Sequence, residues 1–374
     1  MGKVNERNQK ISSYLNSLIT KAKDATYIVD ESSYKTSLDT LFTTDAWGFR
    51  EIILVVVVGR KMDESYKASK GLYDCNPRAI YEGPIKDFFI ENNIPHRKSG
   101  PLNIAKATKG LDTAWAAQRK PQKVAQKVVD IVNLLEKSQI SDFVDMIGVS
   151  LLRRLIAESS RVEKLKVNVK PSADPEWLYK ISHELITKAP DAGNTPQKIA
   201  AFLLKNYHSA MNTGIIVTGE EDRASVTSTT SKKPGDVNEE SADGKIYKVY
   251  EITVKPFDIA RIRDSYDCVN AYNQISKADL HEIIVICRPE DCLVEMKKSS
   301  THSYMGSYEY QDIIYYYWNI YEWVCGTLQR MPFAARSSFY SDLNNYISDI
   351  NTSETVKKLW LELHSKKECA DDKN

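Results

Sequence analysis

The chain has 374 residues, of which 42% are hydrophobic and 27% are charged, and its formal net charge is +1. These proportions are typical of a soluble globular protein and exclude a disordered chain. Because the net charge is close to zero, the overall charge gives no reason to expect a nucleic-acid partner. The longest apolar run, residues 52–58, is too short to cross a bilayer, so no membrane partner is expected.

The six cysteines include no C-x-x-C pair and no His or Cys partners at zinc-finger spacing. We therefore expect reduced thiols in a reducing compartment. The first ten residues are polar and lack the apolar stretch of a secretory signal. Together these features predict a cytoplasmic protein.

Helical patterns dominate the first 210 residues. Apolar residues recur at helical spacing in four segments, and capping or first-turn residues mark three of their starts. These segments are 123–135, 143–155 with Ser141 as a candidate cap, a helix from Pro175, and a helix from Thr195. The run 52–58 fits either a buried strand or the middle of a helix that begins near Asp45.

The pattern changes after residue 210. A short strand is predicted at 215–217, a turn at Asp243-Gly244, a strand from Lys245, a helix over 259–272 and a buried strand over 281–287. A hairpin followed by a crossover helix and another strand builds a mixed α/β sheet. Apolar residues at 313–324 and 343–347 have helical spacing and predict a helical tail. We expect a mainly helical region, 1–210, and a sheet-containing region, 211–374.

Two acids and a lysine surround the predicted hairpin. Asp236 lies on or before its first strand, and Glu251 and Lys255 lie on the second strand, where equal parity places them on one face. Two carboxylates can bind Mg²⁺ and bring a water against a phosphodiester, while a lysine orients the water or neutralises the developing charge. These residues predict Asp236 and Glu251 as metal ligands and Lys255 as the third catalytic group.

This stretch resembles the core of the PD-(D/E)xK nucleases, and specifically that of type II restriction endonucleases. The resemblance covers residues 234–287, from Pro234-Gly235-Asp236 through Glu251-Ile252-Thr253-Val254-Lys255. It implies a restriction-endonuclease-like mixed sheet and Mg²⁺-dependent hydrolysis of double-stranded DNA at a specific short sequence. It also implies a homodimer and a partner DNA methyltransferase that protects the host.

The sequence departs from the family pattern at one position and leaves the first acid open. The family lysine stands two residues after the second acid, where this chain has Thr253. Either Lys255 takes that role, or Thr253-Val254-Lys255 is the aligned triplet and Glu251 supplies the acid from one step earlier. Asp222 and Asp243 compete with Asp236 for the first acid, although Asp243 suits the turn better.

A basic segment in the helical region is a candidate DNA grip. Residues 97–127 carry eight lysines and arginines against one acid, and such a cluster can neutralise several phosphates. Amide and guanidinium groups nearby can bond to base edges. The candidate DNA-binding residues are Arg78, Arg97, Lys98, Asn103, Lys106 and Arg119. The alternative hypotheses are a DNA-binding regulator without catalysis, and a repair or defence nuclease without fixed sequence specificity.

Overall fold

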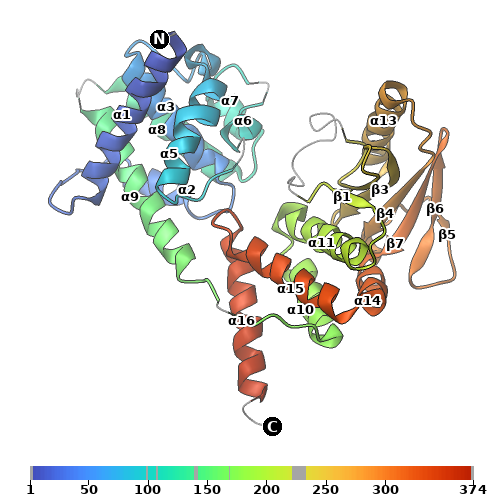
Figure 1. Cartoon of the computed structure of the whole chain (residues 1–374). Coiled ribbons are helices and arrows are strands. Elements are labelled where there is room, and N and C mark those ends of the chain that lie inside the picture. The colour runs from blue at the N-terminus through green and yellow to red at the C-terminus, as the bar shows by residue number, and fades with distance from the viewer. Residues whose placement is uncertain are drawn as a thin grey trace. The chain divides into compact units, whose positions relative to one another are not determined.

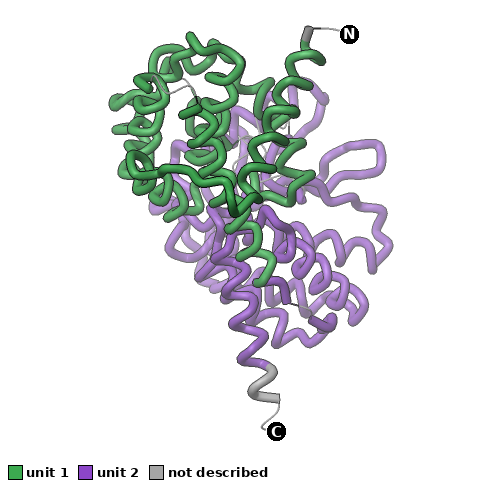
Figure 2. The backbone as a smooth tube through the Cα atoms, turned by 90° about the vertical axis from the view of Figure 1, so that its left-hand side faces the viewer, with its two compact units in different colours: residues 1–164 green, residues 165–374 purple. Residues whose placement is uncertain are grey.

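A computed structural model describes residues 3–97, 100–106, 108–138, 142–167, 169–220 and 233–371. Its contacts divide the chain into two compact units, Met1–Lys164 and Leu165–Asn374 (Figure 2). The mainly helical part extends to residue 210, as predicted, and the seven-stranded sheet follows it. The boundary between the units, however, precedes the boundary expected at 210. The reason is that the last two helices before the sheet pack in the core of the second unit.

In the described residues of the first unit, every regular element is a helix (Figure 1). Its elements are α1 (Lys3–Lys23), α2 (Lys35–Leu41), α3 (Gly48–Met62), η1 (Leu72–Cys75), α4 (Pro77–Ile80), η2 (Tyr81–Ile85), α5 (Lys86–Glu91), α6 (Gly100–Ile104), α7 (Thr113–Ala117), α8 (Gln122–Lys137) and α9 (Phe143–Glu163). The ambiguous run 52–58 lies within α3, and every residue of it is buried. A helix that is apolar on all sides is the central helix of a core, and here α1, α8 and α9 pack around that core.

The second unit holds one mixed sheet of seven strands in the order β1-β2-β3-β4-β7-β6-β5. The strands are β1 (Ile216–Thr218), β2 (Val237–Glu240), β3 (Ile246–Thr253), β4 (Glu282–Cys287), β5 (Lys297–Lys298), β6 (Tyr304–Tyr310) and β7 (Ile313–Asn319). Its helices are α10 (Pro175–Lys188), η3 (Asp191–Gly193), α11 (Asn194–Ala210), α13 (Ile259–Ser276), η4 (Pro289–Asp291), α14 (Ile320–Arg330), α15 (Phe333–Ser348) and α16 (Glu354–Asp371). The predicted α/β class is confirmed.

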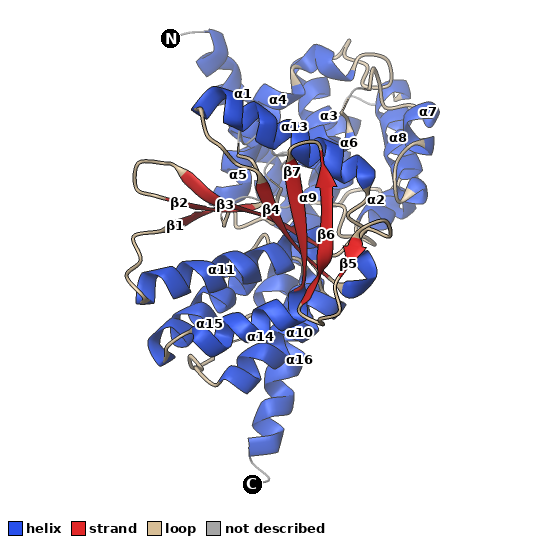
Figure 3. Cartoon of the chain, turned by 90° about the vertical axis from the view of Figure 1, so that its right-hand side faces the viewer, coloured by secondary structure: helices blue, strands red, loops and turns tan. Residues whose placement is uncertain are grey.

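Helices cover both faces of this sheet (Figure 3). Strand β2 is antiparallel to β3, and α13 connects β3 to the parallel strand β4. On β3, Val249 belongs to the core beneath α13, whereas Tyr250 and Ile252 belong to the core shared with α10, α11, α14 and α15. Because side chains alternate along a strand, Glu251 and Thr253 share the α13 face with Val249.

The helical tail predicted over 313–324 is wrong in its first half. Residues 313–319 form β7, and the helix α14 begins only at Ile320. The side chains of Ile313, Tyr315 and Tyr317 are buried at every second position, which is the period of a strand. This apolar and aromatic run matches both spacings over a short distance, and its aromatic residues favour the strand. In the described part of the chain, no helix has the length and apolarity needed to span a membrane.

Candidate active site

The register of β2 and β3 brings Asp236 and Glu251 together. Val237 pairs with Tyr250 and Asn238 pairs with Val249, so Asp236, one residue before β2, stands opposite Glu251. Opposed residues of antiparallel strands point to the same face, with Cβ atoms about 4.5–5.5 Å apart. The backbone N–H of Ile252 donates to Asp236 Oδ2 at 2.9 Å and fixes the carboxylate there. The structure therefore places both predicted acids on the α13 face of the sheet.

Gly235 makes this close approach possible. A Cβ atom at this position would lie 2.5 Å from Val249 Cγ1 and 2.9 Å from the carbonyl oxygen of Tyr250. Since glycine lacks that atom, the chain preceding β2 runs tightly against β3. The glycine directly before Asp236 is thus part of the geometry that sets Asp236 opposite Glu251.

Burial raises the pKa of both carboxyls, and the charge of Asp236 raises the pKa of Glu251 further. Glu251 is only 7% exposed, and burial, followed by the charge of Asp236, raises its pKa well above the ordinary glutamate range. Burial also raises the pKa of Asp236, against the N–H of Ile252 and the charge of Arg261. Two like charges held close together repel each other, and Arg261 offsets this repulsion only in part. The arrangement therefore favours a bound cation.

Arg261, which the sequence analysis did not single out, supplies the nearest positive charge. Its Nη1 donates to Thr253 Oγ1 at 2.5 Å, and its Nη2 lies 4.0 Å from Glu251 Oε2. The guanidinium packs over the Phe257 ring at 4.7 Å, and Asp258 caps the start of α13 by accepting the backbone N–H of Arg261. The pairing with Glu251 is loose, so the carboxylates remain available to a ligand.

A second residue of α13 also contacts the acid pair. The hydroxyl of Ser265, a buried residue, donates to Glu251 Oε1 at 3.2 Å. Arg261 and Ser265 are one helical turn apart, so they share a face of α13. The sequence contains that spacing, but apolar periodicity identifies only apolar residues and therefore does not reveal an arginine and a serine on the inner face of a helix.

Lys255 does not occupy the expected place at the end of the strand. Strand β3 ends at Thr253, whose hydroxyl accepts the backbone N–H of Lys255 at 3.1 Å. Lys255 follows in a bend and is exposed. Of the lysine and arginine side chains in the described part of the chain, Arg261 is the one whose charge lowers the pKa of both acids.

The other candidates for the first acid are excluded or untested. Asp243 is exposed in the turn between β2 and β3, where it accepts a hydrogen bond from Ser241 next to Gly244, which has a φ of 82°. This is the turn position predicted for it. Asp222 lies outside the described residues.

The donor set fits magnesium. Within the described ranges, no group of three or more His, Cys, Asp or Glu side chains could hold a metal, so the candidate site consists of two carboxylates. Mg²⁺ prefers oxygen ligands, keeps several waters and is commonly held by one or two carboxylates together with substrate phosphates. Asp236 and Glu251 therefore suffice as protein ligands for such an ion.

The candidate DNA-binding residues belong to the first unit, whereas the acid pair belongs to the second. Arg78 is exposed and pairs with Glu82 at 3.3 Å, and the guanidinium of Arg97 packs over the Trp47 ring at 4.3 Å. Asn103 and Lys106 are exposed, Arg119 Nη2 donates to the Lys106 carbonyl oxygen at 3.3 Å, and Lys98 lies outside the described residues. Their role in binding DNA stays a prediction.

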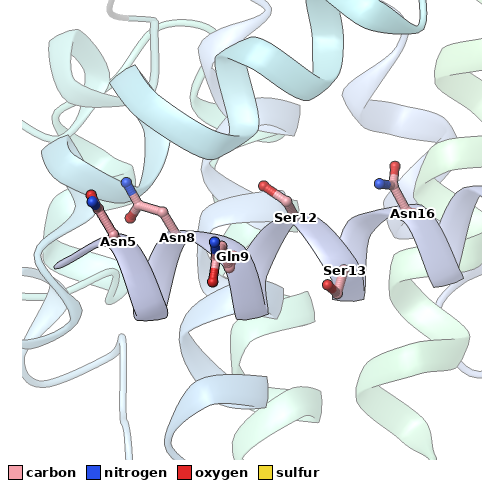
Figure 4. A pocket seen from close by; sticks show the side chains of 6 residues that line it. All are labelled: Asn5, Asn8, Gln9, Ser12, Ser13 and Asn16. Carbon is pink, nitrogen blue, oxygen red and sulfur yellow. The ribbon is translucent and has the colours of Figure 1, made fainter. Parts of the chain in front are cut away.

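The first unit also has a polar hollow along α1 (Figure 4). It measures about 560 Å³ and is lined by Asn5, Asn8, Gln9, Ser12, Ser13 and Asn16. These side chains are amides and hydroxyls from a single helix, with no charged group among them. Because no titratable side chain lines it, the hollow is not a candidate catalytic site.

Comparison with known proteins gives no family: no family model and no curated protein matches the sequence. The function must therefore be argued from the geometry of the acid pair.

Proposed function

We propose that the protein is a Mg²⁺-dependent endonuclease that hydrolyses double-stranded DNA at a specific short sequence, as type II restriction endonucleases do. The observation that carries the proposal is the opposition of Asp236 and Glu251 across β2 and β3. Two carboxylates side by side on an inner face repel each other, and a structural role alone gives no reason for that cost.

Each residue of the site has a distinct role in this proposal. Asp236 and Glu251 would hold Mg²⁺, which, when bound, supplies Lewis-acid stabilisation and activates a water. The N–H of Ile252 and the hydroxyl of Ser265 orient the two carboxylates. Arg261 stabilises the negative charge that develops on the phosphate, a role that the family pattern gives to a lysine.

The partners follow from the same hypothesis. Cutting both strands of a palindrome requires two active sites, so we propose a homodimer, with a DNA methyltransferase that modifies the same sequence. The basic residues of the first unit, Arg78, Arg97, Lys98, Lys106 and Arg119, would neutralise phosphates, and Asn103 would bond to a base edge.

The test is cleavage of plasmid and phage DNA with Mg²⁺ or with EDTA. The wild-type protein should give discrete fragments with Mg²⁺ only. Glu251→Gln should lower the rate by roughly 1000-fold or more, since a metal contributes several kcal/mol of transition-state stabilisation. Asp243→Asn, which alters the exposed acid of the neighbouring turn, is the matched control and should cut normally.

The outcomes separate this proposal from its rivals. A smear in place of discrete bands would indicate a nuclease without fixed specificity. Salt-sensitive DNA binding without cleavage by any divalent metal would indicate a DNA-binding regulator. Normal cleavage by Glu251→Gln would reject the assigned site while leaving nuclease activity in place.

A further inference from the structure

A cavity lies on the sheet face opposite to the acid pair. It measures about 660 Å³ and is bordered by α11, α14 and the strands β2, β3 and β7, all in the second unit. Glu239 pairs with Lys248 across the two strands, and Tyr250 lies two residues further along β3. The alternation of side chains turns these three residues away from Asp236 and Glu251. The cavity is therefore separate from the proposed nuclease site, and its size is typical of small-molecule sites.

A buried carboxylate with one unused oxygen lines this cavity. Glu239 is 6% exposed, and its Oε1 accepts hydrogen bonds from Tyr250 Oη at 2.8 Å and from His208 Nε2 at 3.1 Å. His208 is held in turn by Thr213 Oγ1, 2.9 Å from its Nδ1. Within the described residues, Glu239 Oε2 has no hydrogen-bond donor. This oxygen is open to the cavity, so a ligand there that donates a hydrogen bond can reach it.

Aromatic rings, two cations and a second acid, Glu322, also line the cavity. Tyr250 and Trp323 meet edge to face with centroids 6.5 Å apart, and Tyr207 and Trp318 contribute further rings. Arg330 packs over the Tyr207 ring and donates to its hydroxyl at 2.9 Å, and Lys248 is exposed on β3. Aromatic side chains bind planar bases by stacking, and guanidinium and ammonium groups bind phosphate.

We propose that this cavity binds a nucleotide whose base carries an exocyclic amino group. The amino group donates to Glu239 Oε2, the base lies among Tyr250, Trp318 and Trp323, and the phosphate lies near Arg330 and Lys248. The nucleotide is either free or a unit of a nucleic-acid strand, since both present the same groups.

The probes are adenosine 5′-monophosphate and two analogues, with binding measured by isothermal titration calorimetry on the full chain. Inosine 5′-monophosphate replaces the amino group with a carbonyl oxygen, and adenosine lacks the phosphate. Both analogues should bind about tenfold or more weakly, since a hydrogen bond to a charged group is worth roughly 1.5–3 kcal/mol. Quenching of tryptophan fluorescence, lost in Trp323→Phe, gives a second readout.

Two variants tie binding to the proposed contacts. Glu239→Gln keeps the shape but replaces a carboxylate oxygen with an amide, so it should remove the preference for adenosine 5′-monophosphate over the inosine nucleotide. Glu240→Gln, at the adjacent half-buried glutamate, is the control and should bind normally. Arg330→Gln should weaken binding of the monophosphate but not of adenosine.

The sources are separated by comparing the free nucleotide with a single-stranded oligodeoxyadenylate. Tighter binding of the strand assigns the cavity to nucleic acid, and binding of the mononucleotide alone assigns it to a free nucleotide. Equal affinity for the adenosine and inosine nucleotides, no binding of any probe, or unchanged binding by folded Glu239→Gln would overturn the proposal. None of these results depends on nuclease activity.

Discussion

Two sets of charged side chains, one in each unit and each with at least one buried member, differ in how their charge is compensated. In the first unit, Arg50 and Glu158 form an ion pair at 2.9 Å with 1% and 5% exposure, and the guanidinium packs over the rings of Phe42 and Trp47 at 4.8 and 5.0 Å. In the second unit, Asp236 and Glu251 oppose each other, and the nearest guanidinium nitrogen is 4.0 Å from Glu251. The first set joins opposite charges, whereas the second joins like charges, which our proposal compensates with a bound cation.

This contrast separates a structural buried charge from a functional one. A charge with a partner of opposite sign contributes to a defined fold, and its loss leaves the partner buried and uncompensated. A pair of like charges destabilises the fold in the absence of a ligand and is expected only where binding requires it. The two units should therefore respond to charge removal in opposite directions.

The largest expected effect is the loss of the compensated pair. Glu158→Ala leaves Arg50 buried without its carboxylate and should lower the free energy of unfolding by about 3–5 kcal/mol. For a unit of this size the melting temperature should fall by roughly 10 °C. Thermal and urea unfolding measure this change, and Glu6→Ala, at an exposed ion pair, should cost less than about 1 kcal/mol. An equal decrease in the free energy of unfolding for the two variants would show that the buried pair stabilises the fold no more than the exposed pair does.

Removing one charge of the like-charge pair should have the opposite sign. Because the pKa of Glu251 is raised, the folded state holds its proton more tightly than the unfolded chain, so stability falls as pH rises through that pKa. Glu251→Gln removes this loss. Without metal, the variant should match the wild type near pH 5 and exceed it above neutrality, by on the order of a few kcal/mol.

Urea unfolding of both proteins in EDTA across this pH range measures the difference. Asp243→Asn is the control, because Asp243 is exposed in a turn and should give no such pH-dependent gain. A stability difference between wild type and Glu251→Gln that stays constant with pH would contradict the proposed repulsion between Asp236 and Glu251.

The next effect concerns which positively charged side chain, Arg261 or Lys255, acts together with the acid pair. Arg261→Ala should lower the cleavage rate by roughly 10²–10³-fold, since it removes a positioned charge from the reaction. Lys255→Ala should stay within a few-fold, because Lys255 is exposed beyond the strand. Adding Thr253→Lys to Arg261→Ala places a lysine two residues after Glu251 and should restore part of the rate.

Metal and DNA binding show whether Arg261 acts on the reaction or on the fold. Arg261→Ala should bind DNA in Ca²⁺ normally and bind Mn²⁺ at least as tightly as the wild type, since a positive charge next to the metal has been removed. A collapse of metal binding would indicate a structural role. Full activity of Arg261→Ala together with an inactive Lys255→Ala would return the role to Lys255.

The local pattern of the sequence was enough to predict the strands β1 to β4 and the convergence of Asp236 and Glu251, but not the strands β5, β6 and β7. Alternation over 246–253, the Asp243-Gly244 turn and the buried run at 282–287 each follow from one segment at a time. The strand at 313–319 was mistaken for a helix because a short aromatic run fits both periods. Arg261 was missed for a different reason: its place beside Glu251 depends on how α13 crosses the sheet, which no single segment encodes.

The domain boundary shows the same limit. Helices α10 and α11 have ordinary amphipathic patterns, and their membership in the second unit follows only from packing against the sheet. The cavity around Glu239 likewise combines residues from α11, β2, β3 and α14, so no local motif in the sequence predicts it.

The smallest expected effect links the acid pair to its metal. A ligand at ten times its dissociation constant stabilises the folded state by about 1.4 kcal/mol, which corresponds to a rise of roughly 3–5 °C in melting temperature. Mg²⁺ competes with protons for Asp236 and Glu251, whose pKa values are both raised, so the rise should be small in mild acid and grow as pH increases. Scanning calorimetry with Mg²⁺, compared with NaCl at equal ionic strength, measures it. Glu251→Gln should show no Mg²⁺-dependent rise at any pH; an equal rise in that variant would place the metal elsewhere and leave the opposed carboxylates without a function.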